Sequence, residues 1–126
     1  MDFTINILVV DDFATMRRIV KNVLKELGFT NIFEADDGTA AVEALTTTKI
    51  DFSVSDWNMP RMSGIELLKK VRSTDSWKDI PFLMVTAEGQ ESQILEAVKH
   101  KVNNYIIKPF TPETIKEKIN KIFEGK

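Results

Sequence analysis

The sequence INILVVDD at residues 5–12 joins a nearly continuous, β-branched apolar run to a pair of aspartates. Such a run is typical of a strand that is buried on both faces, as in a parallel sheet. An apolar stripe at helical spacing follows from Met16 to Leu27, and Gly28 is a typical residue for the end of a helix. The basic side chains opposite this stripe are interpreted as a solvated helix surface: Arg17, Arg18, Lys21 and Lys25.

This alternation of strand and helix continues to the end of the sequence. Further strands are expected around residues 30–35, 50–54, 82–85 and 105–107, and further helices around 41–45, 65–71, 94–98 and 112–122. Five strands alternating with five helices predict an α/β fold with a doubly wound parallel sheet. Because Thr30–Ala35 is the least hydrophobic strand, we expect it at an edge, which gives the order 2-1-3-4-5 of a flavodoxin-like sheet.

Composition limits the classes of protein to which this chain can belong. Its 126 residues fit one domain, which we expect to span residues 1–126. The absence of cysteine excludes disulfides, cysteine-based zinc sites and thiol catalysis. A net charge of −2 gives no electrostatic case for binding nucleic acid or a membrane surface. The longest apolar run, Ile7–Val10, is far shorter than a membrane span, so we expect a cytoplasmic protein.

Candidate site residues follow the first, third, fourth and fifth expected strands. Asp11 and Asp12 follow the first strand, Asp56 the third, Thr86 the fourth and Lys108 the fifth. The carboxyl ends of parallel strands meet at one edge of the sheet, where ligands bind at the switch between strands 1 and 3. Clustered carboxylates repel one another unless a cation joins them, and an oxygen-only set favours Mg²⁺ or Mn²⁺ over zinc. The sequence therefore predicts a metal and phosphoryl site at this edge.

Some of these aspartates also have simpler interpretations. Taken alone, Asp12 is typical of an N-cap, because it directly precedes an amphipathic helix. The pair Asp36-Asp37 also follows a strand, but it stands before a glycine turn at the expected edge of the sheet and is interpreted as structural. Joint placement at the switch point is what favours Asp11, Asp12 and Asp56 as a site.

The same placement indicates a reaction. A carboxylate can attack a phosphoryl group to form an acyl phosphate, and Asp56 is the candidate nucleophile because its strand is central. Lys108 and the metal would neutralise charge on the phosphoryl oxygens, and Thr86 would donate a hydrogen bond to one of them.

Four sequence blocks carry a resemblance to a known family. The blocks are Val9-Val10-Asp11-Asp12, Asp56-Trp57-Asn58-Met59-Pro60, Val85-Thr86-Ala87-Glu88 and Tyr105-Ile106-Ile107-Lys108-Pro109-Phe110. In this order and spacing they resemble the receiver domain of two-component response regulators, and within that family the chemotaxis regulators. The resemblance spans the chain and implies one receiver without an output domain. This family is itself a reference example of the 2-1-3-4-5 order, so it adds no independent support to that order.

The resemblance assigns roles to the candidate site. It implies that Asp56 accepts a phosphoryl group from a phosphohistidine of a sensor kinase. It also implies that Mg²⁺ is held by Asp11 or Asp12, by Asp56 and by the backbone carbonyl of Asn58. The protein would thus catalyse its own phosphorylation and dephosphorylation without being a multiple-turnover enzyme.

The resemblance further implies a switch and an output surface. Thr86 and Tyr105 would form the switch pair, and Lys108 would contact the phosphoryl oxygens and precede a cis bond to Pro109. The fourth helix, fifth strand and fifth helix would form the face that a partner reads. The implied partners of this monomer are a chemotaxis sensor kinase, the flagellar motor switch protein and a phosphatase. Trp57 either reports on the site or only packs beside it, and the single histidine, His100, receives no role.

Three stretches depart from the family pattern. Lys99-His100-Lys101-Val102 stands where a small residue and a glycine are usual, Gly89-Gln90-Glu91 where basic residues are common, and Ser63-Gly64 where an acidic residue and a glycine are common. The first two bear on motor binding more than on phosphorylation. A phosphate sink or a non-motor receiver therefore stays open as an alternative.

Two further alternatives come from other classes of protein. A small metal-dependent phosphatase would also use an aspartyl nucleophile, but its usual Asp-x-Asp spacing is missing. A flavin carrier shares the fold, but it would need a phosphate-binding loop rich in Ser, Thr and Gly where Asp11-Asp12 stands.

Overall fold

The computed structural model describes residues 2–87 and 91–124, which form five strands alternating with five helices. The strands are β1 (Asn6–Val10), β2 (Asn31–Ala35), β3 (Phe52–Asp56), β4 (Phe82–Thr86) and β5 (Asn104–Ile107). The helices are α1 (Ala14–Leu27), α2 (Gly38–Thr47), α3 (Gly64–Ser73), α4 (Glu91–Lys99) and α5 (Pro112–Glu124). No helix in these ranges is long and apolar enough to cross a membrane. Glu88, Gly89 and Gln90, which belong to the quoted motif and to one departure from it, lie outside the described residues.

All strand pairs are parallel, and the order β2-β1-β3-β4-β5 confirms the predicted topology. Every residue of β3 and β4 is buried, whereas β2 buries only Ala35, which fits its place at the edge. The register pairs Val10 with both Ala35 and Ser55, and Asp56 with Val85. The strands therefore end side by side, and the residues after them share one edge of the sheet.

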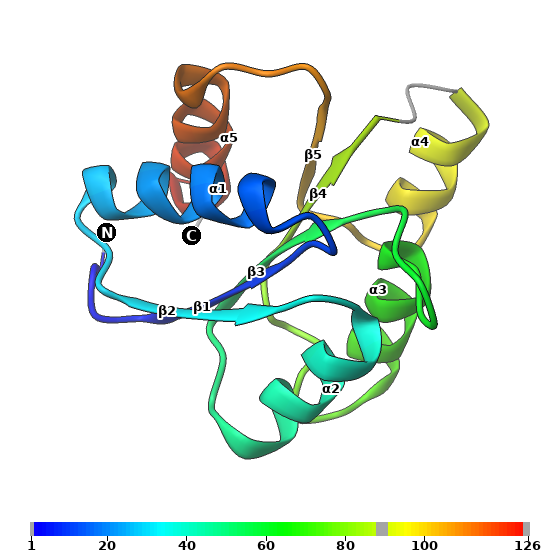
Figure 1. Ribbon diagram of the computed structural model, residues 1–126. Coiled ribbons are helices and arrows are strands. Elements are labelled where there is room, and N and C mark those ends of the chain that lie inside the picture. The colour runs from blue at the N-terminus through cyan, green and yellow to red at the C-terminus, as the bar shows by residue number, and fades with distance from the viewer. Residues whose placement is uncertain (1, 88–90, 125–126) are drawn as a thin grey trace.

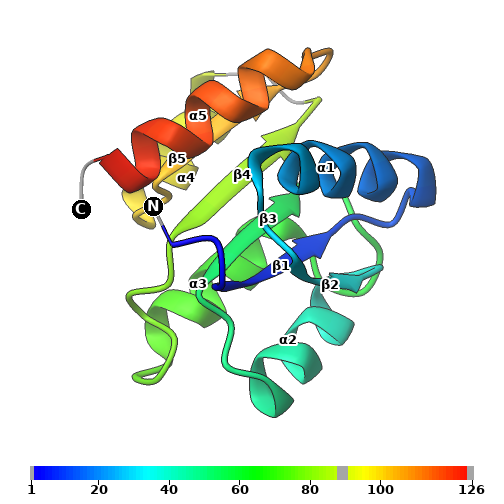
Figure 2. The ribbon, with the colours of Figure 1, turned by 90° about the vertical axis from the view of Figure 1, so that its left-hand side faces the viewer.

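The sheet lies between two layers of helices (Figures 1 and 2), with α1 and α5 on one face and α2, α3 and α4 on the other. Alternate strand residues enter different cores. In β1, Ile7 and Val9 pack with α1 and α5, whereas Leu8 and Val10 pack with the helices of the other face. Two cores on one sheet hold its strands in fixed register, which is what a site built from several strand ends requires.

The ends of several elements follow local rules that the sequence already indicated. Gly28 ends α1 in the left-handed conformation with φ of 113°. Ser63 and Glu66 form the predicted capping box at the start of α3, and Asp37 caps α2 by accepting a hydrogen bond at 2.8 Å. Lys101 has φ of 65° in the turn before β5, so a charged residue does build the turn where the family usually has glycine.

Part of the predicted apolar pattern lies outside the cores. The spacing of Ile94, Leu95 and Val98 correctly identified α4, but Leu95 is 59% and Val98 55% exposed, and the residue that α4 buries is Ala97. Ile19 of the predicted α1 stripe is also exposed. Periodicity identifies the helix, whereas the crossing of the helix over the sheet decides which side is covered.

Candidate functional site

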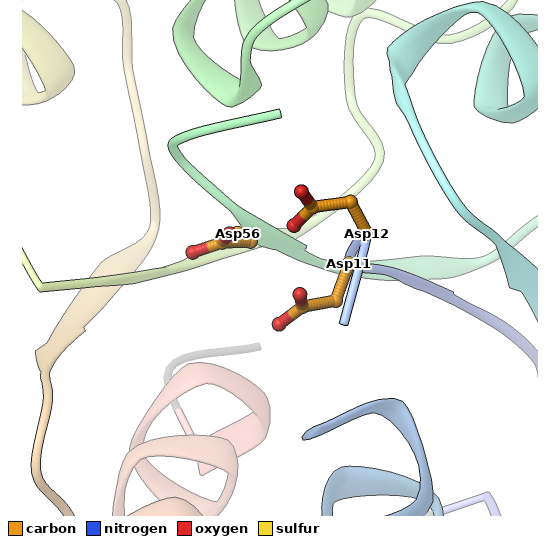
Figure 3. A group of neighbouring side chains, drawn as sticks. All are labelled: Asp11, Asp12 and Asp56. Atoms are coloured by element: carbon orange, nitrogen blue, oxygen red, sulfur yellow. The ribbon is translucent and has the colours of Figure 1, made fainter. Parts of the chain in front are cut away.

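Three carboxylates meet at the carboxyl edge of the sheet, as predicted. Asp11 and Asp12 come from the end of β1 and Asp56 from the end of β3, and each offers an oxygen within 4.8 Å of the others (Figure 3). Asp11 is 4% and Asp56 6% exposed, whereas Asp12 is exposed. The cluster is therefore half embedded in the protein and open to solvent on the side of Asp12.

A lysine from a third strand end neutralises part of this charge. The Lys108 ammonium lies 3.2 Å from Asp56 Oδ1 and 3.8 Å from Asp11 Oδ2. The backbone N–H of Lys108 donates to the Thr86 carbonyl at 2.7 Å, which joins the ends of β4 and β5, and Thr86 is buried. The bond between Lys108 and Pro109 is cis, as the resemblance implied. The structure thus brings together all five residues predicted from the strand ends.

The start of α1 corrects one expectation about Asp12. The N-cap of α1 is Phe13, which makes no side-chain capping bond, so the interpretation of Asp12 as an N-cap is wrong. Instead, Asp11 Oδ1 accepts a hydrogen bond from the Phe13 N–H at 2.9 Å. This bond stabilises the conformation of the turn between β1 and α1. The exposed Asp12 carboxylate remains available to a ligand.

Close packing fixes the end of β3. The Trp57 N–H donates to the Val85 carbonyl at 3.2 Å, and the Gly64 N–H donates to the Trp57 carbonyl at 2.8 Å. A Cβ atom at Gly64 would lie 2.1 Å from the Asp56 carbonyl oxygen, so only glycine permits α3 to start this close to the site. Asn58, whose carbonyl the resemblance assigns to the metal, is exposed in the loop that follows.

The two aromatic candidates differ in burial. Trp57 is buried in the core on the α3 side and therefore has a packing role beside Asp56. Tyr105 is half-buried and packs against the same core. Together with Thr86 and Ala97, both rings line a cavity of about 10 Å³, which has room for at most one water molecule.

Two residues near the site were missed by sequence reasoning. Arg17 was interpreted as part of a solvated face, but its guanidinium donates to the Asp11 carbonyl and lies 3.3 Å from Glu34. Arg61 forms an ion pair with Asp37 and has φ of 67°. Asp37 itself was correctly interpreted as structural. No sequence signal pairs Arg61 with Asp37, whereas Glu34 on the edge strand beside β1 was a weak signal for Arg17.

Burial makes the charged forms of the acidic residues unfavourable. It raises the pKa of Asp11 to about 6, and the neighbouring Asp56 and Asp12 add to this rise while the Phe13 N–H and Lys108 oppose it. Burial also raises the pKa of Asp56, and Lys108 counteracts that rise. One ammonium cannot balance three carboxylates, and all the ligand atoms are oxygens. These donors suit a hard divalent cation.

Replacing Asp11 by Asn should stabilise the metal-free protein at pH 8. The folded-state pKa of about 6 against the ordinary 3.8 corresponds to about 2–3 kcal/mol of unfolding free energy. Above pH 6 the folded state holds an unfavourable carboxylate, and below 3.8 both states are protonated, so the gain should vanish as the pH falls between these values. Urea denaturation in EDTA at several pH values measures the gain.

Asp75→Asn is the matched control, because Asp75 is exposed in the turn after α3. It should change the unfolding free energy by less than about 0.5 kcal/mol. Equal or lower stability of the Asp11→Asn variant at pH 8 would contradict the role given to burial.

Comparison with known proteins adds to this geometry. The family model of the response regulator receiver domain matches residues 7–120. The chemotaxis protein CheY of Pseudomonas aeruginosa is 58% identical over 118 residues, which cover 94% of this chain and 95% of that protein. CheY-3 of Vibrio cholerae is also 58% identical over 118 residues, covering 94% of this chain and 91% of that protein.

Among solved structures, that of CheY4 of Vibrio cholerae has a TM-score of 0.87 at 31% identity and covers 94% of this chain and 98% of its own. The chain is therefore similar to chemotaxis receivers over nearly its full length. It belongs to the response regulator receiver domain family, whose members are phosphorylatable signalling domains and not multiple-turnover enzymes.

Proposed function

We propose that this chain is a cytoplasmic chemotaxis receiver in which Asp56 accepts a phosphoryl group from a phosphohistidine of a sensor kinase. One observation carries the proposal: Asp56 ends the central strand β3, within 4.8 Å of the metal-type ligands Asp11 and Asp12 and 3.2 Å from the Lys108 ammonium. The CheY relatives supply the chemotaxis context. A nucleophile, an anion-binding cation and a metal-type ligand set thus share one edge of the sheet.

The transfer is a displacement at phosphorus. A carboxylate oxygen of Asp56 forms the new P–O bond while the P–N bond of the phosphohistidine breaks, and the leaving imidazole takes up a proton. Lys108 stabilises negative charge on the transferred group, and the Thr86 hydroxyl donates a hydrogen bond to it. Mg²⁺ held by Asp11, Asp12, Asp56 and the Asn58 carbonyl would supply the positive charge that the carboxylates lack.

The signal leaves the site through Thr86 and Tyr105. The buried Thr86 ends β4, and Tyr105 lies on the neighbouring strand β5. Both line the same small cavity, so a movement of Thr86 toward the phosphoryl group changes the space available to the Tyr105 ring. Phosphorylation shifts this equilibrium only to the extent that the active state binds the phosphoryl group better.

The partner surface in this proposal includes α4 and β5. Leu95 and Val98 of α4 and Ile107 of β5 are large apolar side chains that are more than 40% exposed. Apolar groups in such positions suit burial by a protein partner. We propose the flagellar motor switch protein as the reader of this surface, with the kinase and a phosphatase as the other partners.

Asp56→Asn should abolish labelling. With Mg²⁺ and acetyl phosphate, the wild type should gain a hydroxylamine-sensitive phosphoryl group, seen as a mass increase, because an acyl phosphate is labile to that nucleophile. The asparagine variant should gain none and should fail to bind beryllofluoride. Asp36→Asn is the matched control, because Asp36 is an exposed aspartate after β2, and it should label like the wild type. Equal labelling of the Asp56→Asn variant would refute the assignment.

Tyr105 should change its environment when beryllofluoride and Mg²⁺ are added. It is the only tyrosine of the chain, so its ring resonances in NMR spectra of tyrosine-labelled protein give an unambiguous signal. Thr86→Val keeps the shape of the side chain but removes its hydroxyl, and this variant should bind beryllofluoride while its Tyr105 resonances shift much less. Unchanged resonances in the activated wild type would rule out the switch.

A pull-down with the motor switch protein should capture more wild-type protein with beryllofluoride than without it. Leu95→Asp should reduce this capture while Asp56 still labels, because it places a charge in the exposed apolar surface. Ile19→Asp on α1 is the control and should leave capture unchanged. Full labelling without capture in either state would instead support a phosphate sink.

A further inference from the structure

A basic hollow lies on the edge of the sheet opposite to the acidic site. Its volume is about 390 Å³, and its wall includes Lys78, Lys99 and Lys101 together with Arg72, His100 and Asp79. These residues precede β4 and β5 or end α3 and α4, so the hollow faces the amino ends of the strands. With His100 neutral, four cations and one carboxylate give the wall a net charge of +3, against −2 for the whole chain.

Arg72 builds the frame of this hollow. Its Nε donates to the Lys101 carbonyl at 3.1 Å, and its Nη1 donates to the carbonyls of Lys78 and Ile80 at 3.0 and 2.7 Å. Its Nη2 donates to Asn103 Oδ1 at 2.8 Å. These acceptors are all uncharged, and they let Arg72 fix two turns in place. The carboxylate of Asp79 in the same wall interacts with the Arg72 charge, but no ion pair between the two is found among the described residues. The hollow is therefore preformed.

The ammonium groups of the three wall lysines form no ion pair with any residue that the structure describes. Within residues 2–87 and 91–124, the ion pairs engage other lysines, such as Lys69 with Glu96 and Lys116 with Glu26, but none of Lys78, Lys99 and Lys101. All three side chains are exposed. Their mutual repulsion is unfavourable in the free protein, and an anionic ligand would relieve it.

Lys101 ends the turn after α4 in the left-handed conformation, with φ of 65°. Its N–H donates to the Val98 carbonyl at 3.0 Å, and the Val102 N–H donates to the Ala97 carbonyl at 3.1 Å, as is typical of a helix end. Together with the bond from Arg72 to the Lys101 carbonyl, these contacts fix the backbone from which the Lys101 side chain contributes its charge to the hollow.

A second hollow extends the first. Its lining includes Lys69, Lys70 and Ser73 of α3 and the carboxylate of Glu66, and it shares Arg72 and His100 with the basic hollow. Lys69 is paired with Glu96, so Lys70 and Arg72 are the cations that extend the positive charge from α3 to the turn before β5. Apart from His100, the two walls carry no aromatic ring on which a nucleotide base could stack. An extended segment with several carboxylates matches this shape.

We propose that the basic hollow lined by Lys78, Lys99, His100 and Lys101 is a docking site for an acidic peptide segment of a partner protein. The opposite edge of the sheet carries Asp11, Asp12 and Asp56, which repel such a segment. The charge distribution thus directs the segment to one end of the molecule. The phosphoacceptor edge stays accessible while the segment is bound.

Fluorescence anisotropy with a short labelled peptide of alternating Glu and Ser tests the proposal at low ionic strength. The wild type should bind it, and the twin peptide with Gln in place of Glu should bind at least about tenfold more weakly. Lys99→Gln combined with Lys101→Gly should weaken binding about tenfold, because two charged contacts are lost. The glycine suits the left-handed backbone, so this variant should remain folded.

Lys25→Gln combined with Lys118→Gln removes the same charge from α1 and α5 on the other face, and it should change the affinity less than about twofold. Asp56→Asn should bind the peptide like the wild type. No binding to the wild type, equal binding of the two peptides, or equal weakening in both double variants would overturn the proposal. Full displacement of the peptide by inorganic phosphate at constant ionic strength would also overturn it, in favour of a small-anion site.

Discussion

The burial of two neighbouring carboxylates, Asp11 and Asp56, is the constraint on which the site depends. Both are more than nine-tenths buried at the carboxyl edge of the sheet, where the charged forms are poorly solvated. Lys108 reaches both of them, but one ammonium cannot offset the charge of Asp11, Asp12 and Asp56 together. Negative charge therefore exceeds positive charge at this edge of the sheet. A divalent cation bound here would offset the excess negative charge and would attract a phosphoryl group. The buried carboxylates that destabilise the metal-free domain are therefore the same groups that can bind a metal and a phosphoryl group.

How much of this arrangement a sequence can predict depends on how local its cause is. The order of the strands and the convergence of Asp11, Asp56, Thr86 and Lys108 follow from the alternation of elements, because parallel strands must end at one edge. The capping box at Ser63 depends on residues three apart and was predicted for the same reason. The exposure of Leu95 was not predicted, because it depends on how α4 crosses the sheet.

The contacts around the start of α1 were not predicted from the sequence either. Asp12 has the sequence context of an N-cap, but Asp11 accepts the Phe13 N–H and so takes over part of the capping function at the start of α1. Arg17 was interpreted as a solvent-facing residue, although it bonds to the Asp11 carbonyl and pairs with Glu34 on β2. The ion pair of Arg17 depends on Glu34, which becomes close only after β1 and β2 have paired. The bond from Phe13 to Asp11 is local, but either of the two adjacent aspartates could have accepted it, and the sequence does not decide between them.

The geometry also connects Asp56 with the ends of β4 and β5. The Lys108 side chain contacts Asp56 while its N–H is bonded to the Thr86 carbonyl, so the ends of β3, β4 and β5 are connected through one residue. Beside them, Thr86 and Tyr105 share a cavity of only about 10 Å³. A tyrosine ring cannot move inward into so little space unless a neighbour moves first. Because Thr86 is a wall of that cavity, the switch that we propose requires its displacement toward the phosphoryl group to create the space for the ring. In that proposal the two movements form one transition rather than two independent ones.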